Sequence, residues 1–183
     1  AEAAKKIKFP AVVLLVSGGH TALVVMDSMQ SWRKLGETQD DAAGEAFDKV
    51  AKMLGLPYPG GPEVERMARE GNPAAIAFPR PMLHSDDFNF SFSGLKTAVL
   101  YHIRNSKNFL NPSDVCASFQ KAAIDVLVAK TMRAAEENGA QSVLVCGGVA
   151  SNAALSAELK NRSEAAGMQF SAPAMQYTGD NAE

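Results

Sequence analysis

Two apolar runs near the start of the chain predict a pair of buried strands. Residues 9–16 are rich in valine and leucine, and the apolar pattern resumes over residues 21–26. Between them stands Ser17-Gly18-Gly19-His20, and two strands joined by a Gly-Gly turn are typical of a β-hairpin. Residues 32–38 are expected to add a third strand.

Helical periodicity dominates the middle of the chain. Apolar residues recur at helical spacing over residues 40–54, which predicts a helix that Asp40 or Asp41 caps and Gly55 ends. Further helices are expected over residues 62–70, 93–103, 113–138 and 152–166. Ser93, Ser113 and Ser151 stand at the expected starts of three of these helices, where a hydroxyl can accept from a free backbone amide.

Three shorter segments complete the pattern. Phe88-Asn89-Phe90-Ser91-Phe92 alternates strictly, which indicates a half-buried strand or extended segment. Residues 143–146 form a short buried strand, and residues 169–171 are expected to form a last one. The order hairpin, helices, strand, helix favours an α/β fold in which helices pack on a mixed sheet.

Composition and charge narrow the classes of protein. Of the 183 residues, 46% are apolar and 21% are charged, as is usual for a globular domain, and the formal net charge is −2. Because no basic stripe is present, charge alone argues against direct binding of nucleic acid by this chain. No stretch approaches the roughly 20 uninterrupted apolar residues of a membrane span, so no membrane partner is expected. Residues 1–8 carry lysines but do not resemble a signal peptide.

The two cysteines favour a reducing compartment. Cys116 and Cys146 are far apart in sequence and form no Cys-x-x-Cys pair. Cys146 lies in an apolar run and is expected to be a buried thiol. A cytoplasmic location therefore fits the sequence.

The hairpin turn is the first candidate for chemistry. Two glycines let the backbone approach a ligand, and the N–H groups of such a turn can form a nest for an anion. An ordinary tight turn explains the same glycines. Ser17 does not stand in a Gly-x-Ser-x-Gly motif, so it is disfavoured as a hydrolase nucleophile. His20 by itself is more typical of a structural histidine than of a catalyst.

The helix expected over residues 40–54 carries a second candidate. Asp41, Glu45 and Asp48 stand at i, i+4 and i+7, which predicts three carboxylates on one helix face. Gly44 falls on the same face, and since a glycine inside a helix costs about 1 kcal/mol relative to alanine, it suggests that a ligand or another backbone comes close. A solvated acidic face is the plainer alternative.

Three further segments combine turn residues with polar groups. Tyr58-Pro59-Gly60-Gly61-Pro62 suits either a loop that contacts a flat ligand or a connector between helices. Gly147-Gly148 lies between a strand and a helix, where ligands of α/β proteins bind, and Asn152 just beyond it suits either a ribose or base contact or a helix cap. Asp180 is a possible hard-oxygen metal ligand or part of an Asx turn. No His-Glu-x-x-His motif supports a zinc protease.

These segments, in this order, resemble the tRNA N6-adenosine threonylcarbamoyltransferase family, formerly called the O-sialoglycoprotein endopeptidase or glycoprotease family. The matching stretches are LLVSGGHTALV, GETQDDAAGEAFDKVAKMLGLPYPGGP, FNFSFSGLKTAV, CASFQKAAIDVLV, LVCGGVASNAAL and YTGDNA. They cover nearly the whole chain, and the second and third are highly specific.

The resemblance implies a fold, a domain organisation and an activity. The fold is the two-lobed sugar-kinase/actin/Hsp70 (ribonuclease H-like) ATPase fold. Since the family is about twice this length, residues 1–183 are expected to be mostly the C-terminal lobe, with the N-terminal lobe and the C-terminal end absent. The implied activity is transfer of the threonylcarbamoyl group from threonylcarbamoyl adenylate to N6 of the adenosine just 3′ of the anticodon in ANN-decoding tRNAs. An ATP-dependent kinase or ATPase of the same fold, or a non-catalytic scaffold, is the alternative.

The resemblance also implies site residues and partners. Substrate contacts are expected at Leu15, Val16, Ser17, Gly18, Gly19, Asp48, Gly61 and Asn152. His20 is an adjacent catalytic candidate, and Asp180 matches the third ligand of an iron or zinc ion whose other ligands are a His-x-x-x-His pair in the absent lobe. The implied partners are tRNA, a related scaffold subunit and an ATPase subunit. We therefore expect Gly18, Asp48, Gly61 and Asn152 to converge on one adenine nucleotide.

Overall fold

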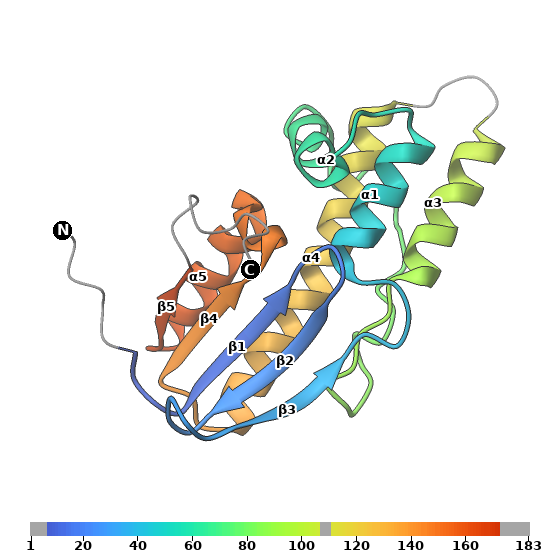
Figure 1. Ribbon diagram of the computed structural model, residues 1–183. Helices are drawn as coiled ribbons and strands as arrows, with labels where there is room; N and C mark the ends of the chain where they lie inside the picture. Colours follow the sequence, from blue (N-terminus) through green and yellow to red (C-terminus); the bar gives the residue numbers. More distant parts are fainter. Residues whose placement is uncertain (1–6, 107–110, 173–183) are drawn as a thin grey trace.

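A mixed five-stranded sheet organises residues 7–106 and 111–172, which are the residues that the computed structural model describes (Figure 1). The strands are β1 (Ala11–Val16), β2 (Thr21–Met26), β3 (Trp32–Glu37), β4 (Ser142–Cys146) and β5 (Gln169–Ser171), in the order β3-β2-β1-β4-β5. The hairpin β1–β2 and the pair β2–β3 are antiparallel, whereas β4 runs parallel to both β1 and β5. The predicted hairpin and the mixed sheet are confirmed.

The helices follow the predicted order. They are α1 (Ala43–Met53), α2 (Gly60–Ala68), α3 (Ser93–Asn105), α4 (Pro112–Glu137), the short 3₁₀ helix η1 (Gly148–Ser151) and α5 (Ala153–Ala165). Figure 1 shows that α4 runs behind the sheet at one end and extends beyond it at the other, where α1, α2 and α3 gather around it. One long helix therefore joins the sheet layer to a helical layer.

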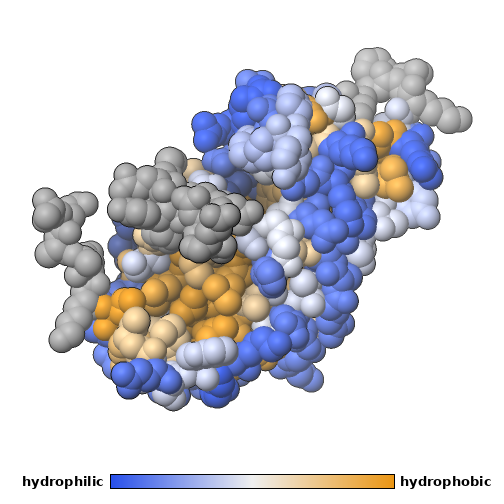
Figure 2. Space-filling view, in the orientation of Figure 1, coloured by the Kyte–Doolittle hydropathy of each residue, from blue (hydrophilic) through white to orange (hydrophobic). Residues whose placement is uncertain are grey.

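One face of strand β1 is completely buried. Val12, Leu14 and Val16 alternate along the strand and are at most 1% exposed, on the face where α4 packs. Leu15 points to the other face and is 38% exposed. Figure 2 shows a broad apolar area over this part of the sheet.

Alternation also positions the segment before α3. Phe90 and Phe92 are fully buried, and Phe90 makes an isolated parallel bridge with Thr38 next to β3. The amide of Phe90 donates to the carbonyl of Glu37 over 3.0 Å, and the amide of Gln39 donates to the carbonyl of Phe90 over 2.9 Å. The predicted extended segment is confirmed.

Three helices begin at other residues than the sequence predicts. Helix α1 begins at Ala43 rather than Asp40, and α2 begins at Gly60 rather than Pro62. In α4 the cap is Asn111, whose side chain accepts from the amide of Ser113, and Ser113 itself lies inside the helix.

Two further capping predictions also change. In α5 the cap is Asn152, not Ser151, which lies in η1. In α3, Ser93 is the first helical residue rather than the cap.

The prediction that Cys146 is a buried thiol is wrong. Cys116 is fully buried in α4, and burial raises the pKa of its thiol to about 11. Cys146, at the end of β4, is only partly buried, because a residue at the edge of the sheet layer is covered on fewer sides. Within the described ranges no helix combines the length and hydropathy needed to cross a bilayer.

Candidate functional site

The turn between β1 and β2 presents free backbone amides. The amide of Ser17 donates to the carbonyl of His20 over 2.8 Å, and the amide of His20 donates to Oγ of Ser17 over 3.1 Å. The amides of Gly18 and Gly19 have no acceptor among the described residues, and a Cβ built on either glycine would meet no atom within 4 Å. Two exposed amides with no side chain in front of them form a concave site for an anion.

Helix α1 begins directly against this turn. The amide of Gly44 donates to the carbonyl of Ser17 over 3.1 Å, and the amide of Ala43 donates to Oγ1 of Thr21 over 2.8 Å. A Cβ on Gly44 would lie 2.6 Å from the carbonyl oxygen of Ser17, so only glycine fits. The close approach expected at Gly44 is confirmed, with the hairpin backbone as the neighbour. The positive end of the α1 dipole therefore lies beside the anion site.

Asp40 does not cap α1; it holds the start of α3 instead. Its Oδ1 accepts from the amides of Phe92 and Ser93 over 2.8 and 3.1 Å, and its Oδ2 accepts from the hydroxyls of Ser91 and Ser93 over 2.5 and 2.8 Å. Burial acts to raise the pKa of Asp40, but these hydrogen bonds outweigh it and hold the pKa below its ordinary value.

Asp41 lies before the helix, so the predicted face of three helical carboxylates is wrong for this residue. It joins α1 to α3 through Lys49 at 2.7 Å and Lys96 at 2.5 Å. Burial acts to raise the pKa of Asp41, but the two lysines outweigh it and lower the pKa. The hydrogen bond to Asp41, then that to Glu45 at 2.8 Å, raises the pKa of Lys49. The acidic residues here are thus largely neutralised.

Asp48 connects α1 to the first turn of α2. Its Oδ1 accepts from the amide of Gly60 over 2.7 Å. A Cβ on Gly60 would lie 2.7 Å from Cα of Asp48, so this glycine lets the two helices approach. At Gly61, in contrast, a Cβ would meet no atom within 4 Å, which leaves the backbone open to a ligand.

The turn after β4 lies at the same end of the sheet as the β1–β2 turn. Gly147 has φ +99°, and a Cβ there would lie 2.3 Å from the carbonyl oxygen of Val16 at the end of β1. Asn152 is 5% exposed: its Oδ1 accepts from the amide of Leu155 over 3.0 Å and its Nδ2 donates to Gln120 over 2.8 Å. The helix-cap interpretation of Asn152 therefore describes its side chain, and its contact with a ligand stays a prediction.

Glu65 is a residue that sequence reasoning missed. Its Oε1 accepts from the amide of Ala153, the first residue of α5, over 3.1 Å. In the sequence it is one of several charges on α2, paired at 3.0 Å with Arg69 one turn later, and nothing in that pattern marks it. The contact joins α2 to the start of α5.

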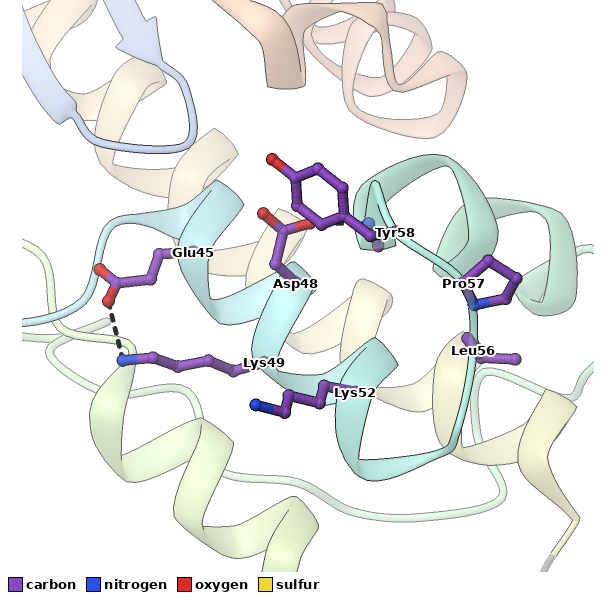
Figure 3. A pocket seen from close by; sticks show the side chains of 8 residues that line it. Glu45, Asp48, Lys49, Lys52, Leu56, Pro57 and Tyr58 are labelled. Carbon is purple, nitrogen blue, oxygen red and sulfur yellow. Dashed lines mark hydrogen bonds and ion pairs between the residues drawn. The ribbon is translucent and has the colours of Figure 1, made fainter.

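The predicted contact segments therefore form a continuous series of contacts around one end of the sheet. The β1–β2 turn contacts α1 through Gly44, the β4–η1 turn contacts β1 through Gly147, α1 contacts α2 through Asp48, and α2 contacts α5 through Glu65. Figure 3 shows Asp48 and Tyr58 on the side of α1 that faces the blue hairpin and the orange segment. Val16 is only 1% exposed, backbone and side chain together, and its contact with a ligand stays a prediction.

A hollow of about 260 Å³ opens beside Asp48, between α1 and the loop that leads to α2 (Figure 3). It is lined by Glu45, Asp48, Lys49, Lys52, Leu56, Pro57, Tyr58 and Gly60. His20 is exposed at the hairpin and lies outside this lining.

The predicted metal ligand cannot be placed. Asp180 lies outside the described residues. Within residues 7–106 and 111–172, no group of three histidine, cysteine, aspartate or glutamate side chains is arranged to hold a metal ion.

Comparison with known sequences identifies close relatives. A family model described as tRNA N6-adenosine threonylcarbamoyltransferase matches residues 1–183. The chain is 54% identical over 181 residues to the tRNA N6-adenosine threonylcarbamoyltransferase of Geobacter metallireducens, covering 97% of this chain and 53% of the relative. The protein of the same name from Moorella thermoacetica is 54% identical over 179 residues, covering 96% and 52%. The chain thus spans about half the length of the curated relatives it matches.

Solved structures of lower identity share the fold. HypF from T. kodakarensis superposes with a TM-score of 0.56 at 22% identity, over 72% of this chain and 17% of that chain. Component A of (R)-2-hydroxyglutaryl-CoA dehydratase from Acidaminococcus fermentans superposes with a TM-score of 0.55 at 16% identity, over 91% and 57%. The predicted sugar-kinase/actin/Hsp70 fold class is confirmed.

Proposed function

Because the chain belongs to the tRNA N6-adenosine threonylcarbamoyltransferase family, we propose that it supplies the nucleotide-binding part of an enzyme that moves a threonylcarbamoyl group from threonylcarbamoyl adenylate to tRNA. The acceptor is N6 of the adenosine just 3′ of the anticodon in ANN-decoding tRNAs. The observation that carries the proposal is the chain of contacts that brings two Gly-Gly turns and the starts of α1, α2 and α5 to one end of the sheet.

The adenylate occupies these segments in one orientation. Its phosphate accepts hydrogen bonds from the free amides of Gly18 and Gly19, beside the positive end of α1. Oδ2 of Asp48, which has no hydrogen-bond partner among the described residues, accepts from a ribose hydroxyl. The open backbone at Gly61 lets the nucleoside lie against α2. Leu15, Val16 and Ser17, the other predicted contacts, lead into this turn at the end of β1.

The transfer needs no protein nucleophile. The lone pair of the N6 amine attacks the carbamoyl carbon, the bond from that carbon to the phosphate oxygen breaks, and the electron pair leaves with AMP. The proton lost by the amine passes to His20, which is exposed at the end of the turn. The two glycine amides stabilise the charge that grows on the leaving phosphate, and holding both substrates together supplies much of the acceleration.

The proposal extends to the longer protein to which this chain corresponds. Residues 1–183 belong mostly to the C-terminal lobe of a two-lobed enzyme, whose partners are tRNA, a related scaffold subunit and an ATPase subunit. The iron or zinc ion that the resemblance implies would take Asp180 as one ligand and, when bound, would stabilise negative charge on the reacting groups.

A transfer assay tests the proposal. The full-length protein, its partner subunits, threonylcarbamoyl adenylate made from labelled threonine, and unmodified tRNA are expected to give label in the tRNA. Asp48→Ala is expected to reduce the incorporation, and Asp86→Ala is the matched control, since Asp86 is an exposed carboxylate with no hydrogen bond to a described residue. Turnover of ATP without tRNA and no label in the RNA would instead favour a kinase or ATPase. No label and no turnover would favour a scaffold.

A further inference from the structure

The hollow beside Asp48 adjoins the proposed adenylate site without coinciding with it. Of the residues expected to contact the adenylate, only Asp48 lines the hollow. The other lining residues come from α1, from the loop before α2 and from Gly60 at the start of α2. Since the proposed reaction joins two substrates, the acceptor RNA must also bind close to the adenylate site.

Tyr58 gives the hollow an aromatic wall. It is 86% exposed, more than Trp32 at 64% or Tyr101 at 59%. Pro57 and Pro59 flank it and restrict the backbone, so the ring is presented from a stiff loop. Figure 3 shows the ring beside the carboxylate of Asp48. An exposed ring on a stiff backbone can stack on a base with little loss of conformational entropy.

One positive charge in the hollow has no partner among the described residues. Glu45 is paired with Lys49 at 2.8 Å, and Asp48 accepts from the amide of Gly60. Lys52 is exposed and makes no ion pair or hydrogen bond with a described residue. The hollow thus offers an aromatic face and an ammonium group that has no ion-pair partner among the described residues.

We propose that Tyr58 and Lys52 hold an unpaired nucleotide of the acceptor RNA. The base stacks on the Tyr58 ring and the phosphate pairs with Lys52, which is how proteins bind single-stranded RNA. The phosphate of the adenylate is assigned to Gly18 and Gly19, so Lys52 remains available for a phosphate of the RNA. Recognition by stacking also fits a chain of net charge −2. This inference rests on the proposed function.

Binding measurements on the full-length protein test it. The probes are a labelled anticodon stem-loop of an ANN-decoding tRNA, followed by fluorescence anisotropy, and AMP, followed by calorimetry. Tyr58→Ala is expected to weaken stem-loop binding about tenfold, within the range measured for loss of one aromatic stacking partner. Tyr58→Phe keeps the ring and is expected to bind within about twofold of the unchanged protein. AMP affinity is expected to stay constant in both.

Lys52→Ala supplies an independent measurement. Stem-loop affinity falls as salt rises, and Lys52→Ala is expected to make this dependence less steep. The slope of log K for binding against log salt should become less negative by about 0.7, the value for one phosphate contact on a single strand. Tyr58→Ala should leave the slope unchanged. Tyr101→Ala and Lys160→Ala are the matched controls, because both residues are exposed and outside the hollow. Melting temperatures of all variants check that each one folds.

Two results would overturn the inference. One is stem-loop affinity that stays within about twofold in Tyr58→Ala, which is the change expected when no stacking partner is lost. The other is a loss confined to AMP, which would assign the ring to the adenylate. Failure of the proposed function has a different signature, since the unchanged enzyme would then transfer no threonylcarbamoyl group to tRNA, whatever the variants bind.

Discussion

The backbone amide of Gly60 donates a hydrogen bond to Oδ1 of Asp48 over 2.7 Å, which holds the first turn of α2 against α1. The second carboxylate oxygen has no partner within the described part of the chain. One side chain therefore supports the local structure and remains available to a ligand, and the two roles can be separated by substitution.

Asp48→Asn and Asp48→Ala are expected to differ in stability but not in the direction of their effect on binding. Asparagine keeps an acceptor for the Gly60 amide, whereas alanine leaves that amide without a partner and is expected to lower the free energy of unfolding by about 1–2 kcal/mol. Both remove the charge that holds the ribose, so both are expected to weaken binding of an adenine nucleotide. Urea unfolding and calorimetric titration measure the two effects. Equal stability of the two variants would contradict the structural role.

Gly44→Ala and Gly61→Ala are expected to have opposite profiles. A Cβ at Gly44 collides with the carbonyl of Ser17 at 2.6 Å and with Cα of Gly18 at 2.8 Å, so the hairpin turn must move, which costs about 1–3 kcal/mol of stability. A Cβ at Gly61 meets nothing, so stability is expected to stay the same or rise by up to about 1 kcal/mol. The added methyl group at Gly61 nevertheless obstructs the nucleotide.

Urea unfolding measures the stability of the two variants, and calorimetric titration measures their affinity for AMP. If Gly61→Ala is stable and binds AMP with unchanged affinity, Gly61 does not face the nucleotide. If Gly44→Ala unfolds at the same urea concentration as the unchanged protein, the close approach of α1 to the turn is not required.

The stability contributed by Asp40 is expected to depend on pH. Its pKa is lower in the folded state than the ordinary value of 3.8, so its contribution is fully present above pH 3.8 and is lost as the pH falls through the lower folded pKa. Asp40→Ala is expected to destabilise the protein by about 1–2 kcal/mol at neutral pH, as loss of a helix cap does. The difference from the unchanged protein should shrink below pH 3.8.

Urea unfolding of both proteins at a series of pH values measures this dependence. Asp86→Ala controls for removal of any exposed acidic group in the same region of the chain. A stability difference for Asp40→Ala that stays constant down to acid pH would show that the hydrogen bonds to Phe92 and Ser93 do not depend on the charge of the carboxylate.

The two cysteines are expected to react at different rates. Burial raises the pKa of the Cys116 thiol to about 11, so little thiolate is present in mildly alkaline solution, and its complete burial in the core shields it from reagent. Cys146 is only partly buried and should be alkylated first in the folded protein. Mass spectrometry after brief treatment with iodoacetamide locates the label. In Cys146→Ser, labelling should wait for unfolding, and rapid labelling of Cys116 would contradict its burial.

The periodicity of apolar residues by itself determined much of the fold. The apolar runs of β1 and β2, the Gly-Gly turn between them and the 3.6-residue period of α1 are local properties, because each depends on residues only a few positions apart. The order of elements then limited the topology to an α/β layer structure. The resemblance of the motifs pointed to the family and to the candidate site residues in the same way, from short stretches of sequence.

Tertiary structure decided which partner each polar group takes. Asp40 and Asp41 stand where a cap is expected, yet packing places the hydroxyl of Thr21 at the start of α1 and directs Asp40 to α3. The sequence left two roles open for Asn152 and did not indicate a role for Glu65, because their partners Gln120 and Ala153 are distant along the chain. Local propensity acts over a few residues, whereas hydrogen-bond partners and clefts depend on which distant segments the core brings together, and only the folded chain specifies that.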